Sequence, residues 1–124
     1  MSSTIEINDD FMTLESIKNQ FNKKYPHLKI EFFETKYTNG EASPKELVYD
    51  GAFRIKDIRK EGAMVPISIH ENLKTSTLEK LFEEELGLHI QVYKKSNNTW
   101  VQIMATDNWT LSQQETDMLN QKDE

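Results

Sequence analysis

Few side chains in this chain are arranged as acid–base or metal chemistry would require. His27, His70 and His89 are too far apart for a local metal motif such as H-x-x-x-H, and no carboxylate stands beside them at a metal-ligand spacing. The chain also lacks G-x-S-x-G, P-loop and G-x-G-x-x-G motifs. We therefore predict no catalytic residue, no cofactor and no bound metal, and we favour a protein that is not an enzyme.

Three further features could each form part of a site but also have a structural interpretation: the acidic run 83–85, Asp107 and Trp109. The acidic run 83–85 could bind a cation or a basic partner, although a solvated helix face also explains it. Asp107 is expected in a turn that leads into a capped helix. Trp109 is predicted to plug the core, at the place that Phe53 takes earlier in the chain, with a ligand platform as the alternative.

Length and composition limit the class of protein. A chain of 124 residues is long enough for one domain, which buries roughly two-thirds of the surface that its unfolded form would expose. The chain has no cysteine, which excludes disulfides, zinc sites with thiolate ligands and a cysteine nucleophile. The start, MSSTIEINDD, does not resemble a secretory signal, and no apolar run approaches the roughly 20 residues of a membrane helix. We expect a single domain over residues 1–124 in a soluble cytoplasmic protein.

The net charge of −6 is distributed unevenly. Residues 1–60 contain ten acidic and ten basic side chains, whereas residues 61–124 contain eleven acidic and five basic ones. The acidic half would be repelled by a phosphate backbone. We therefore expect neither nucleic acid nor a membrane as partner.

Hydrophobic periodicity and turn residues predict the elements of the first half. Leu14, Ile17, Phe21 and Tyr25 recur at helical spacing between the plausible N-cap Thr13 and the breaker at residue 26. The expected elements are a strand over 4–7, a helix over 13–25, strands over 28–33 and 46–49, and a short helix around 55–58.

The second half repeats this order. A capping box of Ser76 and Glu79 is expected to start a helix that ends at Gly87 in a left-handed cap, and a second box of Thr110 and Gln113 is expected to start another. The predicted strands cover 65–69, 88–93 and 100–104, with a turn at 96–98 between the last two. Residues 120–124 form a frayed tail in this interpretation.

The two halves superpose by position. Offsets of 61, 60 and 56 residues bring the first helix, the second strand and the segment after the hairpin onto their counterparts. We predict an α+β fold of two tandem β-α-β-β(-α) units, over about 4–62 and 63–119, with each β-α-β step a right-handed crossover. The expected sheet is mixed, with about six short strands and helices mainly on one face. Whether it is continuous or split stays open.

The segment LFEEELGLHIQVYKKSNNTW, followed by ATDNWTL, resembles the C-terminal part of an uncharacterised family of small bacterial proteins. In that family a helix end centred on glycine leads to two strands and a D-x-W-T-L close. The resemblance covers the last third of the chain and implies a fold unit without an assigned activity. It further implies that Asp107, Trp109 and Thr110 belong to a shared structural device.

One sheet face is predicted to be more aromatic than solvent contact requires, which is typical of interaction surfaces. Its residues are Phe33, His89, Gln91, Tyr93, Trp100, Gln102 and Met104. We expect a protein-interaction or adaptor module whose partner is another protein or a second copy in a two-fold homodimer. Two alternatives stay open: the last helix covers this face, or His89, Tyr93 and Trp100 surround the pocket of a small ligand-binding domain or enzyme. A third option, binding of single-stranded nucleic acid, is disfavoured because only Lys29, Lys94 and Lys95 lie near this face.

Overall fold

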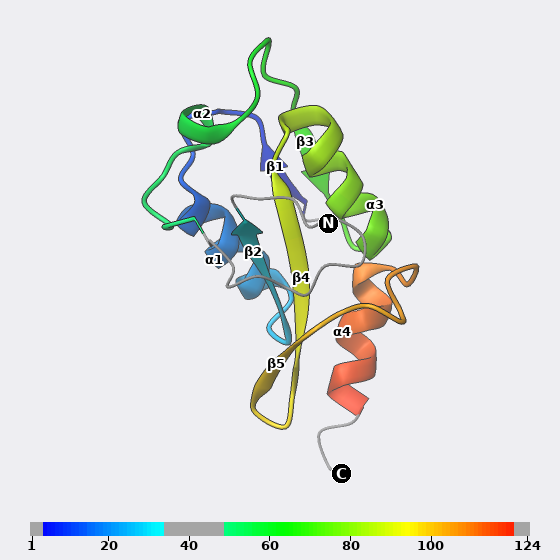
Figure 1. Ribbon diagram of the computed structural model, residues 1–124. Coiled ribbons are helices and arrows are strands. Elements are labelled where there is room, and N and C mark those ends of the chain that lie inside the picture. Colours follow the sequence, from blue (N-terminus) through cyan, green and yellow to red (C-terminus); the bar gives the residue numbers. More distant parts are fainter. Residues whose placement is uncertain (1–3, 34–48, 121–124) are drawn as a thin grey trace, which may run out of the picture.

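A computed structural model describes residues 4–33 and 49–120, with side chains as far as residue 118 (Figure 1). The elements in chain order are β1 (Ile5–Ile7), α1 (Leu14–Lys24), β2 (Leu28–Phe33), α2 (Ile55–Ile58), β3 (Ile67–Ile69), α3 (Thr75–Leu81), the π-helical turn η1 (Phe82–Leu86), β4 (His89–Ser96), β5 (Thr99–Gln102) and α4 (Leu111–Asn120). The predicted α+β class is confirmed. The strand expected over 46–49 lies almost entirely outside the described residues, as does the tail beyond residue 120.

The strands of the described ranges form two separate antiparallel sheets, so the predicted mixture of parallel and antiparallel strands is wrong for them, and the sheet that the sequence left as continuous or split is split. β1 pairs with β3, while β2, β4 and β5 form the second sheet in the order β2-β4-β5. The strands on either side of α1 thus belong to different sheets, and β1-α1-β2 is not a crossover within one sheet. Each of β1 and β2 pairs instead with a strand from the other half of the chain.

α1 follows the sequence prediction closely. Its N-cap Thr13 accepts a hydrogen bond from the Ser16 backbone N–H through its hydroxyl oxygen (3.1 Å). Its buried residues are Leu14, Ile17 and Phe21, which are spaced three and four residues apart and form one stripe.

The beginning of α3 was predicted incorrectly, because the loop before α4 satisfies its first N–H groups. Thr75 N–H donates to the Trp109 carbonyl (2.9 Å), and Ser76 N–H donates to the Asp107 carbonyl (2.7 Å). The helix therefore begins at Thr75, and no capping box of Ser76 and Glu79 is needed. By contrast, the box of Thr110 and Gln113 at α4 is confirmed, with bonds of 3.1 and 2.8 Å.

The turns confirm two further predictions. Gly87 ends η1 at φ 69°, the left-handed conformation that glycine adopts without a Cβ clash. Asn97 and Asn98 have φ values of 53° and 65°, which makes the β4–β5 connection a two-residue turn of the primed type.

Both sheets and the three longer helices enclose a single buried cluster. The largest fully buried side chains are Phe21 of α1, Phe32 of β2 and Phe82 of η1, and the last two rings lie 5.7 Å apart edge to face. Ile5 and Ile69 enter the cluster from the smaller sheet. The buried side of β2 and β4 therefore faces α1 and α3, which leaves the opposite side of this sheet for the predicted surface.

The same four backbone hydrogen bonds occur twice in the molecule, at the loop crossings that precede the helices. We call the two sets the first clamp and the second clamp. In the first clamp, Leu14 N–H bonds Phe53 O (2.9 Å), Glu15 N–H bonds Gly51 O (2.9 Å), Ile55 N–H bonds Met12 O (2.9 Å) and Lys56 N–H bonds Asp10 O (2.7 Å). In the second, Thr75 N–H bonds Trp109 O (2.9 Å), Ser76 N–H bonds Asp107 O (2.7 Å), Leu111 N–H bonds Leu73 O (2.9 Å) and Ser112 N–H bonds Glu71 O (3.0 Å). Each donor and acceptor is related to its counterpart by the offsets of 61 and 56 residues that the sequence suggested.

Candidate interaction surface

Five of the seven predicted surface residues lie together on the side of the β4–β5 hairpin that faces away from the helices. The strand register places Tyr93 beside Gln102 and Lys95 beside Trp100, and neighbouring β4 residues Ile90 and Val92 point into the core. We call the group on this side the aromatic face: His89, Gln91, Tyr93, Trp100 and Gln102. All five side chains are partly exposed.

Phe33 does not belong to this exposed surface. It lies beside His89 in the β2–β4 register, but it is only 4% exposed and thus part of the interior. The alternation of side chains along a strand predicts on which side a residue lies, but not what covers that side. Met104 follows β5 and is 70% exposed, so it is available at the margin of the aromatic face.

A lysine from the neighbouring strand sits against both aromatic rings. Lys29 Nζ lies 5.4 Å from the ring centroid of Tyr93 and 5.1 Å from that of Trp100. Lys95 Nζ lies 5.9 Å from the Trp100 centroid on the same face. Such cation–π contacts contribute about 0.5 to 1 kcal/mol each at exposed positions. The β2–β4 register puts Lys29 beside Tyr93 and so brings its ammonium onto the rings.

Polar contacts order the rest of the aromatic face. Gln102 donates a hydrogen bond from its amide nitrogen to the Gln91 amide oxygen (2.6 Å), which links β4 and β5 across the face. On β2, the Glu31 carboxylate forms ion pairs with the ammonium groups of Lys18 (Nζ–O 3.0 Å) and Lys29 (Nζ–O 3.2 Å). His89 Nδ1 lies 3.7 Å from a Glu83 carboxylate oxygen, a separation that makes a weak contact.

α4 does not cover the aromatic face, so the alternative that the last helix covers this face is wrong. Leu111 of α4 belongs to the buried cluster on the helix side of the sheet, together with Leu78 and Val92. Buried Gln114 donates to the Thr75 hydroxyl of α3 (3.2 Å) and to the Thr106 carbonyl (2.6 Å). These contacts place α4 next to α3, behind the sheet as seen from the aromatic face.

Glu79 of α3 is a carboxyl group with a strongly raised pKa. Its carboxylate accepts the Val92 backbone N–H (3.2 Å) at the point where β5 has diverged from β4, and so replaces a strand partner. Burial raises the pKa of Glu79 to about 7, and the nearby negative charge of Asp107 adds to this, while the bond from Val92 opposes it. A shifted pKa also occurs in catalytic acids. Here the contact with the strand edge explains it structurally.

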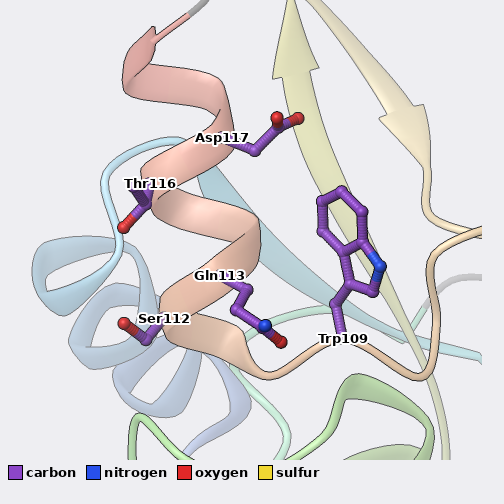
Figure 2. A pocket seen from close by; sticks show the side chains of 5 residues that line it. All are labelled: Trp109, Ser112, Gln113, Thr116 and Asp117. Atoms are coloured by element: carbon purple, nitrogen blue, oxygen red, sulfur yellow. The ribbon is translucent and has the colours of Figure 1, made fainter.

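A pocket of about 350 Å³ lies beside α4, and no residue of the aromatic face lines it (Figure 2). It is lined by Trp109, Ser112, Gln113, Thr116 and Asp117. The prediction that Trp109 plugs the core is wrong, because its indole is only partly buried and forms a wall of this pocket. Phe53 at the corresponding position is 41% exposed. None of His89, Tyr93 and Trp100 lines this pocket.

Three observations concern possible metal ligands, membrane spans and relatives of the chain. Within residues 4–33 and 49–118, no group of three or more His, Asp and Glu side chains could hold a metal ion. No helix in the described part of the chain is both long and apolar enough to cross a bilayer. Comparisons with protein-family models, curated proteins and solved structures found no match to this chain.

Proposed function

We propose that this protein is a non-enzymatic interaction module that associates with a second copy of itself through the aromatic face. The carrying observation is the pair of partly exposed rings, Tyr93 and Trp100, held by Lys29 on a sheet surface that no described helix covers. Aromatic residues and methionine are enriched at the centres of protein interfaces, and Met104 stands exposed at the margin. A helix-free sheet face of this composition suits a broad contact with another folded surface.

A second copy is the partner whose chemistry fits best. Lys29, Lys95 and Glu31 add two cations and an anion beside the aromatic face, and the glutamines of the face offer both donors and acceptors. A two-fold contact brings a surface against itself, so a surface with both kinds of group can be complementary to its own copy. Opposite charges can then face each other across the axis.

The mass of the protein in solution tests this proposal directly. We expect sedimentation equilibrium at micromolar concentrations to show a dimer, and Trp100→Ala to weaken dimerisation because it removes the larger of the two rings of the face. Trp109→Ala is the matched control, since it removes the other tryptophan at a place outside the face and should leave the dimer intact. A wild-type monomer at all concentrations would contradict the proposal, as would equal effects of the two variants.

We also infer that the chain consists of two tandem units over about 4–62 and 63–119. The two clamps support this, because all four hydrogen bonds of one recur in the other at constant offsets. The six-strand arrangement is supported by a bond from Tyr49 N–H to Phe32 O (2.9 Å), which brings the end of segment 46–49 beside β2. Cross-strand nuclear Overhauser contacts between 46–49 and β2 would test the sixth strand, and their absence would contradict it.

A small-molecule site around His89, Tyr93 and Trp100 receives less support. These residues lie on the surface of one hairpin, and Lys29 and Lys95 already occupy positions against the Trp100 ring. Ligand pockets usually enclose most of a small molecule between several walls. This arrangement favours a contact with a large partner.

A further inference from the structure

β5 forms one edge of the larger sheet, because the strand order is β2-β4-β5. Ile103 N–H donates to the Val92 carbonyl, so the backbone groups of Ile103 point toward β4. In an antiparallel pair the direction of these groups alternates along each strand. The N–H and C=O groups of Trp100 and Gln102 therefore point away from β4, and no described strand pairs with them.

The side chains of β5 do not protect this edge. Edge strands of soluble proteins usually contain a lysine, a proline or a bulge, each of which hinders pairing with another chain. β5 has the sequence TWVQ, with no charged residue and no proline, and its register with β4 has no bulge. Val101 adds an apolar side chain, 42% exposed, on the side of the strand opposite to Trp100 and Gln102. These properties suit β5 to pair with a further strand.

The register of β5 with a second β5 is self-complementary. When two copies run antiparallel around a two-fold axis at Val101, Trp100 of one copy lies beside Gln102 of the other. These two residues have the outward backbone groups, so each can donate to and accept from the other. The two Val101 residues then form a pair without mutual hydrogen bonds, in which the side chains are closest and the Cα atoms lie about 4.5 Å apart. The exposed valines cover each other, and no like charges meet on the paired strands.

We propose that β5 pairs edge to edge with β5 of a second copy, which joins the two three-stranded sheets into one across a two-fold axis at Val101. Trp100 and Gln102 also belong to the aromatic face, so the faces of the two copies become continuous on one side of the joined sheet. This contact uses the backbone edge of the hairpin, whereas the contact proposed above uses its aromatic surface. Either contact can form without the other, and a chain that makes both forms assemblies larger than a dimer.

Disulfide formation at position 101 tests the geometry, because the chain has no cysteine of its own. Val101→Cys should form a disulfide-linked dimer in a glutathione buffer, since Cα atoms about 4.5 Å apart lie within the range that a disulfide spans. Val65→Cys is the matched control, because Val65 is 38% exposed and lies outside the strands. On non-reducing gels, the dimer of Val101→Cys should form at least about tenfold faster than that of Val65→Cys, because pairing raises the effective concentration of the thiols. Equal rates overturn the proposal.

Amide hydrogen exchange at low and high protein concentration tests the backbone bonds in the unmodified chain. We expect the exchange of the Trp100 and Gln102 N–H groups to slow at high concentration, because these groups donate to the second copy. Val101→Lys places two ammonium groups against each other at the axis and should remove this concentration dependence, whereas Val65→Lys should preserve it. Exchange at Trp100 and Gln102 that does not depend on concentration overturns the proposal.

The same variants separate the edge contact from the dimer through the aromatic face. A dimer that persists in Val101→Lys but is weakened by Trp100→Ala shows the face contact alone and overturns the edge contact. Trp100→Ala keeps the backbone groups of residue 100. Rapid crosslinking at position 101, together with a dimer that Trp100→Ala leaves intact, therefore supports the edge contact and contradicts the contact through the face.

Discussion

The two clamps hold the molecule with the same backbone bonds but with different side chains. Leu14 in the first clamp corresponds to Thr75 in the second, and Ile58 of α2 corresponds to Gln114 of α4. Leu14 is buried and Ile58 packs against the same cluster, whereas Thr75 and Gln114 are buried polar residues that bond each other. The backbone arrangement thus tolerates an apolar or a polar filling, provided that each buried polar atom finds a partner.

The outer surfaces of the clamps differ more than their interiors. In the first, Arg54 and Lys56 follow exposed Phe53 and lie over Phe11. In the second, Thr110 and Ser112 occupy the positions of these basic residues, and Trp109 lines a pocket. Equivalent residues that only stabilise the fold should have similar effects on stability when they are substituted in either half. Residues that bind a partner need have no equivalent in the other half. Paired substitutions can therefore separate the two.

The largest effects are expected from the two equivalent core phenylalanines. Phe21 and Phe82 are related by the offset of 61 residues, and both are 0% exposed. Phe21→Ala and Phe82→Ala should each lower the free energy of unfolding by about 3 to 5 kcal/mol, because each leaves a cavity in the shared core. Urea denaturation followed by circular dichroism measures both.

Exposed Phe53 provides the control for this pair, since Phe53→Ala should cost much less than either core substitution. If one core variant unfolds the protein and the other costs less than 1 kcal/mol, the halves are not energetically equivalent. That outcome would weaken the inference of tandem units, whatever the backbone bonds suggest.

Most helices and strands could be predicted from the sequence, but the pairing of the strands could not. The stripe of Leu14, Ile17 and Phe21 and the alternation in 28–33 predicted α1 and β2 almost to the residue, because local periodicity depends on which side is buried. Pairing depends on contacts between distant segments, so the partnership of β1 with β3 was missed. The aromatic face was predicted from the alternation of side chains along the strands, whereas the pocket beside Trp109 depends on how the loop before α4 packs against that helix, which local periodicity does not predict.

Replacing Gln114 by its counterpart from the first clamp should have the second largest effect. Gln114→Ile leaves the Thr106 carbonyl and hydroxyl without their bonds of 2.6 and 3.2 Å. We expect a loss of about 2 to 3 kcal/mol, since a partly buried polar group that loses its partner costs about 1 to 3 kcal/mol. Thermal and urea denaturation measure this loss.

The double variant Thr75→Leu/Gln114→Ile sharpens the same comparison, because it gives the second clamp the apolar pair of the first. It should be less damaging than the sum of its single substitutions, since the two side chains contact each other. If the stability losses of the two single substitutions were strictly additive in the double variant, the apolar pair of the first clamp would not be a substitute for the polar pair of the second.

Glu79 should make stability depend on pH. Its pKa is raised from 4.5 to about 7 in the folded protein, so between these values the folded state keeps a proton that the unfolded state releases. The free energy of unfolding should therefore fall as pH rises from about 4.5 to 7, by about 1 to 2 kcal/mol after solvent screening is considered. Urea denaturation at several pH values measures this slope.

Glu79→Gln should flatten this part of the pH profile, because glutamine does not titrate and can still accept the Val92 N–H through its amide oxygen. Asp107→Asn should reduce the slope less, since the charge of Asp107 is the smaller cause of the raised pKa. The raised pKa of Glu79 would be contradicted if the free energy of unfolding of the wild type rose between pH 4.5 and 7 while that of Glu79→Gln did not change with pH.

The smallest effect is expected at Lys18, which takes the place of Glu79 in the first half. Both residues extend from a helix to a strand, but Lys18 pairs with the partly exposed carboxylate of Glu31 (3.0 Å), whereas Glu79 accepts a backbone N–H. Lys18→Met keeps most of the aliphatic chain and should cost no more than about 1 kcal/mol, and less at high salt. Because Glu31 also pairs with Lys29, it keeps a cation in this variant. A cost as large as that at Gln114 would mean that the Lys18 contact, and not only the shared backbone bonds, holds the first half in place.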